Sequence, residues 1–459
     1  MSRVQGWGLL AGLALVLAVL VLPAPPGLPL AGWRVLGLGL AMAVWWSTEP
    51  VPIALTSILP VLVLPLLGVT SLAEATAPFG NPLVFLFLGG FMLAAAVEQH
   101  GLHRRLAWHV LRRAGGDPRR LVAGFLLVTA FLSMWISNTA AVMLMLPVAL
   151  AVTRDPAQPA ALAVPVLLAL AWGASIGGTG TLIGTPPNAL MAAWLSESQG
   201  IELGFARWSA LALPFVALFL LLAWGALTWR LPRGSGVALA LQAPGPASRA
   251  EKRVAALFLA AAGLWMARPL LGQIPGLEAL SDTGIALAVA LALFVVPGGS
   301  GPLMRWEAAR GIPWHVLLLF GGGLSLAAAM DGSGLAQWVG QGLAGLGDWP
   351  VPLILLAVSA AVMLLSELLS NTALVAALLP VIGAIAQGTG LPVPELAAAV
   401  ALSASCAFML PAGTPPNALV FASGQVSVAQ MMRRGAVMNV VTMLLVTLVV
   451  GLWGPRVLG

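Results

Sequence analysis

SNTA at 137–140 and SNTA at 370–373 stand in the middle of two long apolar stretches, 121–152 and 350–387. Ser, Asn and Thr cap helix starts, and hydrocarbon penalises each of their polar groups that stays unpaired. Each stretch is too long for one ordinary membrane span and too polar at its centre for two closely joined spans. We therefore predict two re-entrant hairpins of half-helices, because non-helical backbone at membrane depth is tolerated only inside protein or beside a water-filled cavity.

The composition of the whole chain is that of a polytopic membrane protein. Of its 459 residues, 60% are hydrophobic and 8% are charged, and the mean hydropathy is +1.00. We expect an all-α fold in the lipid bilayer, with no separable water-soluble domain. The lone Cys406 excludes an internal disulfide. The basic residues lie in short loops between apolar runs, so the net charge of +6 indicates membrane orientation rather than binding of nucleic acid.

About eleven further apolar segments predict helices that cross the membrane. The first begins at residue 7 and lacks a small-residue cleavage site, so we interpret it as a span and not as a signal peptide. The predicted spans are 7–23, 33–47, 51–69, 83–101, 160–196, 208–230, 253–271, 282–297, 313–330, 396–424 and 430–453.

The distribution of Lys and Arg gives the orientation. With both hairpins returning to the side they enter from, 17 of the 21 basic residues fall on one side. The other side holds Arg34, Arg207, Arg268 and Arg456. This asymmetry predicts eleven crossings and a cytoplasmic N-terminus in the cell membrane, and a hairpin that crossed fully would weaken it.

The chain also contains an internal duplication. FLGGFMLAAAVEQHGL (87–102) matches FGGGLSLAAAMDGSGL (320–335), and SNTAAVMLMLP (137–147) matches SNTALVAALLP (370–380), both 233 residues apart. GTPPNAL occurs at 184–190 and again 229 residues later. Each half would hold five crossings and a hairpin, and the odd number turns the second copy upside down. The segment 231–252 is the predicted linker between the halves.

The two motifs have complementary chemistry. In an inverted repeat the SNT tips enter from opposite sides and can meet near the midplane, where helix starts stabilise an anion without a basic side chain. Two consecutive prolines force a break in the helix that carries GTPPNAL, and the freed carbonyls can coordinate a hard cation such as Na⁺. We predict two cation sites flanking one anion pocket. A purely structural role as caps of broken helices would not require both motifs in both copies.

Several other polar residues have open interpretations. Glu367 lies three residues before Ser370 and has no equivalent in the first copy, so both a structural hydrogen-bonding role and proton relay remain open. His315 follows Pro313 at a helix start, where capping or an interfacial position competes with proton coupling. We expect Glu98 and Asp331 to be solvated at helix ends. His100, His103 and His109 are expected to face water or headgroups.

Two other classes of membrane protein fit less well. A membrane-embedded enzyme would need a nucleophile with its base or a metal cluster, and the sequence has no such pattern. We therefore expect that the chain is not an enzyme. A channel is disfavoured because duplicated broken helices and closed hairpins are typical of alternating access.

These motifs resemble the divalent anion:sodium symporter family, with paired SNT motifs in two re-entrant hairpins and a Pro-Pro-Asn break in the helix that follows. The resemblance extends from TEPVPIALTSILP (48–60) to the final GTPPNA. It implies Na⁺-coupled uptake of di- or tricarboxylates, or of sulfate, by a homodimer in which a transport domain slides against a scaffold as an elevator. The scaffold would be 7–111 and 253–330, and the moving part 120–230 and 350–453.

The resemblance also implies which residues bind. One Na⁺ would be held by Ser133, Ser137, Asn138 and the Gly184 backbone. A second Na⁺ would be held by Ser366, the Leu369 carbonyl, Asn371 and the Gly413 backbone. The substrate would contact Asn138, Thr139, Thr185, Pro186, Asn371, Thr372, Thr414 and Pro415. Ser366 stands where members of the family often have Thr, which keeps the hydroxyl.

The leading functional hypothesis is Na⁺-driven uptake of a C4-dicarboxylate such as succinate, malate or fumarate, or of citrate. The alternatives are transport of sulfate or another anion, and dicarboxylate exchange that needs no Na⁺. His315 replaces what is commonly a small residue in the family, which leaves exchange or proton coupling open.

Overall fold

The computed structural model describes residues 2–155, 159–232, 243–299, 301–342, 345 and 349–458. Within these ranges the regular secondary structure is helical, and a single β-bridge joins Pro297 to Pro302. The predicted all-α fold is confirmed. The middle of the predicted linker 231–252, residues 233–242, lies outside the described residues, and its last residues, from Arg249 on, belong to α13.

Eight described helices are long and apolar enough to cross a bilayer. They are α1 (Arg3–Val21), α2 (Leu30–Thr48), α6 (Pro82–Gln99), α12 (Phe205–Thr228), α13 (Arg249–Leu271), α16 (Trp314–Gly332), α19 (Asn371–Thr389) and α22 (Val428–Val457). Shorter apolar helices include α14 (Asp282–Val295). The chain is therefore built as a multi-pass membrane protein, and the number of crossings stays a prediction.

The predicted span 51–69 is not one helix. It consists of α3 (Ile53–Thr56) and α4 (Leu59–Leu66), which are separated at Ser57 and Ile58. Pro60 lacks the amide hydrogen that would bond the carbonyl of Thr56, where α3 ends, and it occupies the first turn of α4, which explains the interruption. The chain continues through the short helices α5 (Leu72–Thr76) and η1 (Ala77–Gly80) into α6.

Both halves have the same order of helices. In the first, α6 is followed by α7 (Leu102–Ala114), α8 (Pro118–Ser133), α9 (Asn138–Thr153), α10 (Ala163–Gly178), α11 (Pro186–Gln199) and α12, with η2 (Ala160–Leu162) before α10. In the second, α15 (Trp306–Ala309) and α16 are followed by α17 (Leu335–Gly342), α18 (Val351–Ser366), α19, α20 (Val393–Ala404), α21 (Pro415–Ala422) and α22. The duplication seen in the sequence thus extends to the structure.

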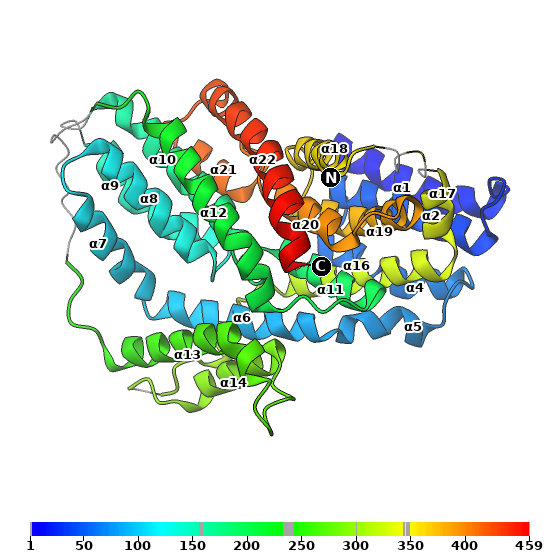
Figure 1. Ribbon diagram of the computed structural model, residues 1–459, viewed down its shortest axis with the longest axis horizontal. Coiled ribbons are helices and arrows are strands. Elements are labelled where there is room, and N and C mark those ends of the chain that lie inside the picture. The colour runs from blue at the N-terminus through cyan, green and yellow to red at the C-terminus, as the bar shows by residue number, and fades with distance from the viewer. Residues whose placement is uncertain are drawn as a thin grey trace.

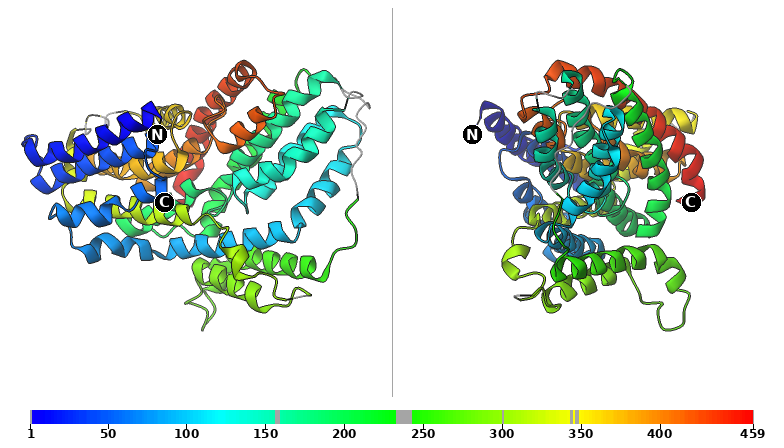
Figure 2. Two further views of the ribbon diagram at one scale, coloured as in Figure 1. Left: turned by 180° about the vertical axis from the view of Figure 1, so that it is seen from behind. Right: turned by 90° about the vertical axis from the view of Figure 1, so that its left-hand side faces the viewer.

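The helices form one elongated bundle (Figure 1). At one end α8, α9, α10 and α12 lie side by side, and α13 and α14 pack along α6 at the lower edge. The view from behind shows α1 and α2 together at the opposite end (Figure 2).

The equivalent helices α10 and α20 are the interior of the bundle, since every side chain from Pro165 to Gly178 and from Glu395 to Ala404 is buried. Glycine lets α8 approach α10 closely. A Cβ at Gly177 would collide with the backbone of Ala130, and one at Gly173 would lie 2.6 Å from the Leu126 carbonyl. Small residues permit such close packing where hydrophobic burial does not drive helix association.

Helix α7 connects α6 to the first hairpin and corrects one expectation. His100 is half-buried and His109 is exposed, but His103 is 4% exposed and so does not face water. It shares a buried face with Ala107 and Leu111, at a spacing of four residues that places all three on one side of a helix. Burial, together with the charge of the adjacent Arg104, lowers the pKa of His103.

We expect acid to destabilise the protein through His103. Because the folded-state pKa lies below the ordinary value of 6.5, the unfolded chain binds a proton first as the pH falls. The free energy of unfolding should therefore decrease from about pH 6.5 downwards. Melting temperatures between about pH 7.5 and pH 5.5 should fall less for His103→Phe than for the wild type. Equal slopes for both proteins would contradict this prediction.

Candidate functional site

Both predicted hairpins are interrupted at SNT. In the first, α8 ends at Ser133 and α9 begins at Asn138, with Ser137 at the N-cap, where its hydroxyl accepts the Ala140 N–H at 3.2 Å. In the second, α18 ends at Ser366 and α19 begins at Asn371. Ser370 holds the N-cap position there without a side-chain cap. The prediction that each apolar stretch is a pair of helices broken at SNT is confirmed.

A hydrogen bond across each tip is the same in both repeats. The Ser133 hydroxyl donates to Asn138 Oδ1 at 2.5 Å, and the Ser366 hydroxyl lies 2.8 Å from Asn371 Oδ1. Ser366 also lies 2.6 Å from the Ala404 carbonyl, so its single proton is shared between two acceptors. Both serines are fully buried. The structure therefore brings together two predicted cation ligands in each repeat.

The helix that follows each hairpin is broken at GTPPN, as predicted. The chain leaves helical geometry between Gly178, the end of α10, and Pro186, the start of α11. The second break runs from the end of α20 at Ala404 to Pro415, the start of α21. The prolines occupy the first two helical positions, where a missing amide hydrogen costs no helical hydrogen bond.

Oxygen atoms converge at the first break. A Cβ on Gly178 would collide with Asn138 Oδ1. One on Gly184 would collide with the Gly178 carbonyl oxygen and would lie 2.9 Å from that of Ser133. Glycine is needed at both positions because backbone and side-chain oxygens approach so closely. An arrangement of hydroxyl, amide and carbonyl oxygens suits a hard cation.

At the second break the Glu367 carboxylate binds the backbone. One oxygen accepts the N–H groups of Phe408 and Met409, each at 2.8 Å, and the other accepts that of Leu410 at 2.9 Å. The Asn439 side chain on α22 donates to the carboxylate at 2.8 Å. These contacts favour the structural role for Glu367. Position 134 is the equivalent in the first repeat, where Thr181 donates instead to the Met134 carbonyl at 2.5 Å.

The two repeats are interlocked through these same elements. Helix α21, from the second GTPPN motif, packs against α9 and α10 of the first repeat. Reciprocally, α11 packs against α19 and α20 of the second. Trp172 and Phe408 meet with ring centroids 5.8 Å apart, and a Cβ on Gly383 would lie 2.7 Å from the Trp194 ring. Each SNT half-helix is thus covered by the broken helix of the other repeat.

The remaining predicted residues line these breaks with different exposure. Thr185, Gly413 and Thr414 are buried. Thr139, Pro186, Leu369 and Thr372 are partly buried, and Ser137 and Pro415 are exposed. His315 is exposed at the start of α16, and Glu98 and Asp331 are exposed near the ends of their helices, where they were expected.

Sequence reasoning missed Thr181, Asn188, Asn417 and Asn439, which organise the breaks. The repeated asparagine of GTPPN was a usable signal, and nothing in the sequence pointed to Asn439.

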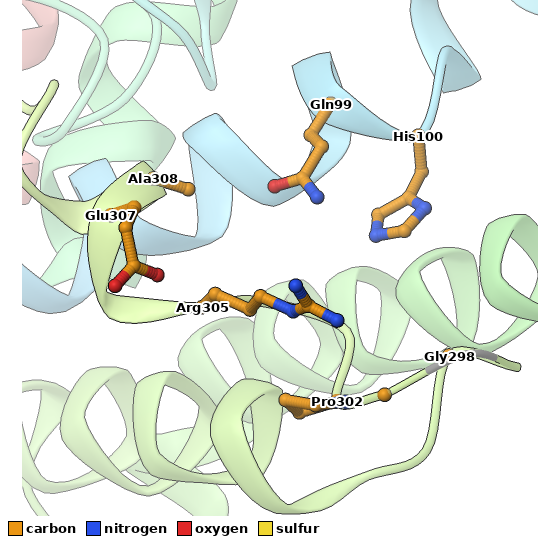
Figure 3. Close-up of a pocket in the computed structure, with 8 residues that line it drawn as sticks. Gln99, His100, Gly298, Pro302, Arg305, Glu307 and Ala308 are labelled. Carbon is orange, nitrogen blue, oxygen red and sulfur yellow. The ribbon is translucent and has the colours of Figure 1, made fainter.

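A cavity of about 560 Å³ lies away from the hairpin tips. Gln99 and His100 at the end of α6 face Arg305 across it (Figure 3). His100 Nε2 lies 2.8 Å from the Leu303 carbonyl, which ties the end of α6 to the loop before α15. None of the predicted ligands line this cavity, so we do not assign the substrate to it.

The fold resembles that of two solved transporters. The YdaH transporter of Alcanivorax borkumensis superposes with a TM-score of 0.62 at 18% identity, over 93% of this chain and 98% of that one. MtrF of Neisseria gonorrhoeae, described as one of a class of antimetabolite efflux pumps, gives 0.59 at 14% identity, over 99% and 95%. At such low identity the likeness shows the fold alone.

Sequence comparison identifies the family. The model of the sodium:sulfate symporter transmembrane region matches residues 3–459. A sodium-dependent dicarboxylate transporter, SdcS, of Staphylococcus saprophyticus is 36% identical, over 98% of this chain and 92% of its own length. The protein of the same name from Staphylococcus aureus is 37% identical over the same shares. The family and these relatives are transporters and not enzymes. This confirms the prediction that the chain is not an enzyme. The chain is therefore a secondary transporter of the divalent anion:sodium symporter family.

Proposed function

We propose that this protein takes up a C4-dicarboxylate such as succinate, driven by Na⁺. The observation that carries the proposal is the duplicated Ser–Asn pair at the hairpin tips, each pair beside a helix broken at GTPPN. The names of the SdcS relatives support both the cation and the class of substrate.

Two Na⁺ ions would be transported together with the substrate. The first would bind Ser133, Ser137, Asn138 and the Gly184 backbone. The second would bind Ser366, the Leu369 carbonyl, Asn371 and the Gly413 backbone. The convergence of Asn138 Oδ1 with the carbonyls of Ser133 and Gly178 supports the first site. In the second, the Glu367 carboxylate lies against Gly413 and adds a negative charge that favours a cation.

The anion would bind between these cations. Helices α9 and α19 begin in the SNT tips, at Asn138 and Asn371, and helices α11 and α21 begin after the GTPPN breaks, at Pro186 and Pro415. The positive ends of these four helix dipoles therefore lie at the tips and the breaks. Thr139, Thr185, Thr372 and Thr414 supply hydroxyls, and Pro186 and Pro415 supply apolar walls. Neither motif contains Lys or Arg. Bound Na⁺ would therefore offset the charge of the substrate, which couples the two binding events.

Movement would follow an elevator in a homodimer, with a cytoplasmic N-terminus. The parts 120–230 and 350–453 would slide against a scaffold of 7–111 and 253–330. These parts contact each other where α11 and α19 pack on α16 and where α12 packs on α13. Beside α13 the Phe205 N–H donates to Asp282 Oδ2 at 2.7 Å. Trp135, at the first hairpin tip, stacks there on Phe205 and Trp265. This contact would have to open during transport.

The test is uptake of labelled succinate into proteoliposomes. We expect accumulation with an inward Na⁺ gradient and none when K⁺ replaces Na⁺, because the anion site lacks a basic side chain of its own. Succinate counterflow that is indifferent to Na⁺ would identify an exchanger and reject symport. Labelled sulfate that accumulates with Na⁺ while succinate does not would reject the dicarboxylate and support the alternative that the family description suggests.

A further inference from the structure

The asparagine of GTPPN makes an equivalent contact in both repeats. Asn188 is fully buried, and its side-chain nitrogen lies 3.3, 3.2 and 2.8 Å from the carbonyl oxygens of Gly178, Thr179 and Thr181. Asn417, also fully buried, donates to the carbonyls of Ala407 and Leu410 at 3.1 and 3.0 Å. Positions 407 and 410 lie 229 residues after 178 and 181, which is the offset of the motif itself. The two repeats thus share two hydrogen bonds at equivalent positions as well as the GTPPN motif itself.

Each asparagine bridges one break. It sits in the first turn of α11 or α21 and reaches back to carbonyls of the unwound segment, which begins at Gly178 at the end of α10 in the first repeat and after Ala404 at the end of α20 in the second. An amide nitrogen carries two hydrogens, so one side chain can hold two carbonyls in a fixed relation. The unwound segment is thereby fixed at both ends.

The carbonyls held in this way adjoin the proposed cation ligands. The Gly178 carbonyl abuts Gly184, and the Cα of Gly178 faces Asn138 Oδ1. In the second repeat a Cβ on Gly413 would lie 3.3 Å from the Leu410 carbonyl. A carbonyl oxygen has two lone pairs. The Gly178 and Ala407 carbonyls accept only the asparagine amide among the described residues, so each keeps a lone pair for a cation, whereas the Leu410 carbonyl also accepts the Gly413 N–H at 3.1 Å.

The side-chain oxygen of each asparagine argues against a role in packing alone. Oδ1 of Asn188 and Oδ1 of Asn417 are buried, and neither has a hydrogen-bond partner among the described residues. A buried acceptor without a partner is unfavourable, and leucine would fill a similar volume without that cost. The donor end must therefore provide what the site requires.

We infer that Asn188 and Asn417 are positioning residues for the two cation sites, each holding the carbonyl oxygens of its break where Na⁺ binds. The inference rests on the proposed function, since it assumes Na⁺ at these breaks. A neutral amide suits this role because it orders the carbonyls without adding a charge that would repel Na⁺.

The test is Na⁺ binding without substrate. The melting temperature of the purified protein is followed as Na⁺ replaces choline at constant ionic strength, for the wild type, Asn188→Leu and Asn417→Leu. We expect each variant to need about tenfold more Na⁺ for half-maximal stabilisation, the usual scale for residues that orient metal ligands. In proteoliposomes the Na⁺ concentration for half-maximal uptake should shift likewise, with a smaller change in the succinate KM at saturating Na⁺.

Smaller substitutions and a matched control keep the test decisive. Asn188→Ser and Asn417→Ser fit the same space and cannot span two carbonyls, so they should show the same shift if the leucine variants do not fold. Ser209→Ala, at a fully buried hydroxyl on α12 outside the breaks, should leave the Na⁺ dependence unchanged.

The outcomes separate the two proposals. Variants that melt lower in choline and keep the wild-type Na⁺ dependence would overturn the inference, because the amides would then be structural only. A wild type that Na⁺ does not stabilise would instead reject the proposed cation sites themselves.

Discussion

Asn138→Ala and Asn371→Ala are each expected to abolish Na⁺-driven succinate uptake, with a loss of about 100-fold or more in kcat/KM, or about 2.7 kcal/mol. Each asparagine accepts a hydrogen bond from the serine at the end of the preceding half-helix and stands at the first position of the next. Alanine removes an oxygen proposed to contact both Na⁺ and substrate. It also leaves a buried serine hydroxyl with one acceptor fewer, so the ligand next to it loses its orientation as well.

The measurement is the initial rate of labelled succinate uptake, compared with the amount of protein inserted. Thr129→Val and Thr442→Val are the matched controls, because both hydroxyls are buried and donate within their own helices, α8 and α22. The controls should transport normally, and all four variants should elute from size exclusion as the wild type does. Wild-type uptake by both asparagine variants would remove these residues from the site.

Glu367→Ala is expected to destabilise the protein more than any other single truncation of a carboxylate in the described chain. It would leave three backbone N–H groups of the second break and the Asn439 amide without their acceptor. Buried donors left unpaired cost about 1–3 kcal/mol each, so a loss of at least about 3 kcal/mol is expected even after relaxation. Glu367→Gln keeps the shape but turns one acceptor into a donor, and it should fall between alanine and the wild type.

Melting temperature without Na⁺ measures this effect separately from cation binding. For a chain of this length a loss of about 3 kcal/mol corresponds to about 3 °C by size scaling. Glu98→Gln, at an exposed carboxylate near the end of α6, should melt with the wild type. If Glu367→Gln and Glu367→Ala both have the melting temperature of the wild type, the hydrogen bonds of the carboxylate do not stabilise the fold.

The helix breaks were predictable because their causes are local. Consecutive prolines at 186–187 and 415–416 determine where α11 and α21 begin, and the SNT residues interrupt both hairpins within a residue or two of the predicted position. The pairing of Ser133 with Asn138, five residues apart, lies within one tip and was also accessible from the sequence. Proline and capping rules act over this same short range.

What the sequence did not predict depends on distant partners. Glu367 bonds residues 408–410 and Asn439, about 40 and 72 positions away, and no periodicity links these positions. Two other differences are local: the hydropathy of 51–69 predicts one continuous helix, although its prolines already argue against it. His103 was placed with its arginine neighbours, although the spacing of His103, Ala107 and Leu111 already indicated a buried face.

The packing of α21 on α9 and of α11 on α19 has a consequence for biosynthesis. When the ribosome has released the first half of the chain, α9 and α11 are complete, but the segments that cover them have not been translated. The surfaces of α9 and α11 that contact the second repeat therefore stay exposed to the translocation machinery or to lipid until the C-terminal helices are inserted. Assembly of the core is thus a late event, and a truncated product would leave those surfaces bare for degradation by quality-control proteases.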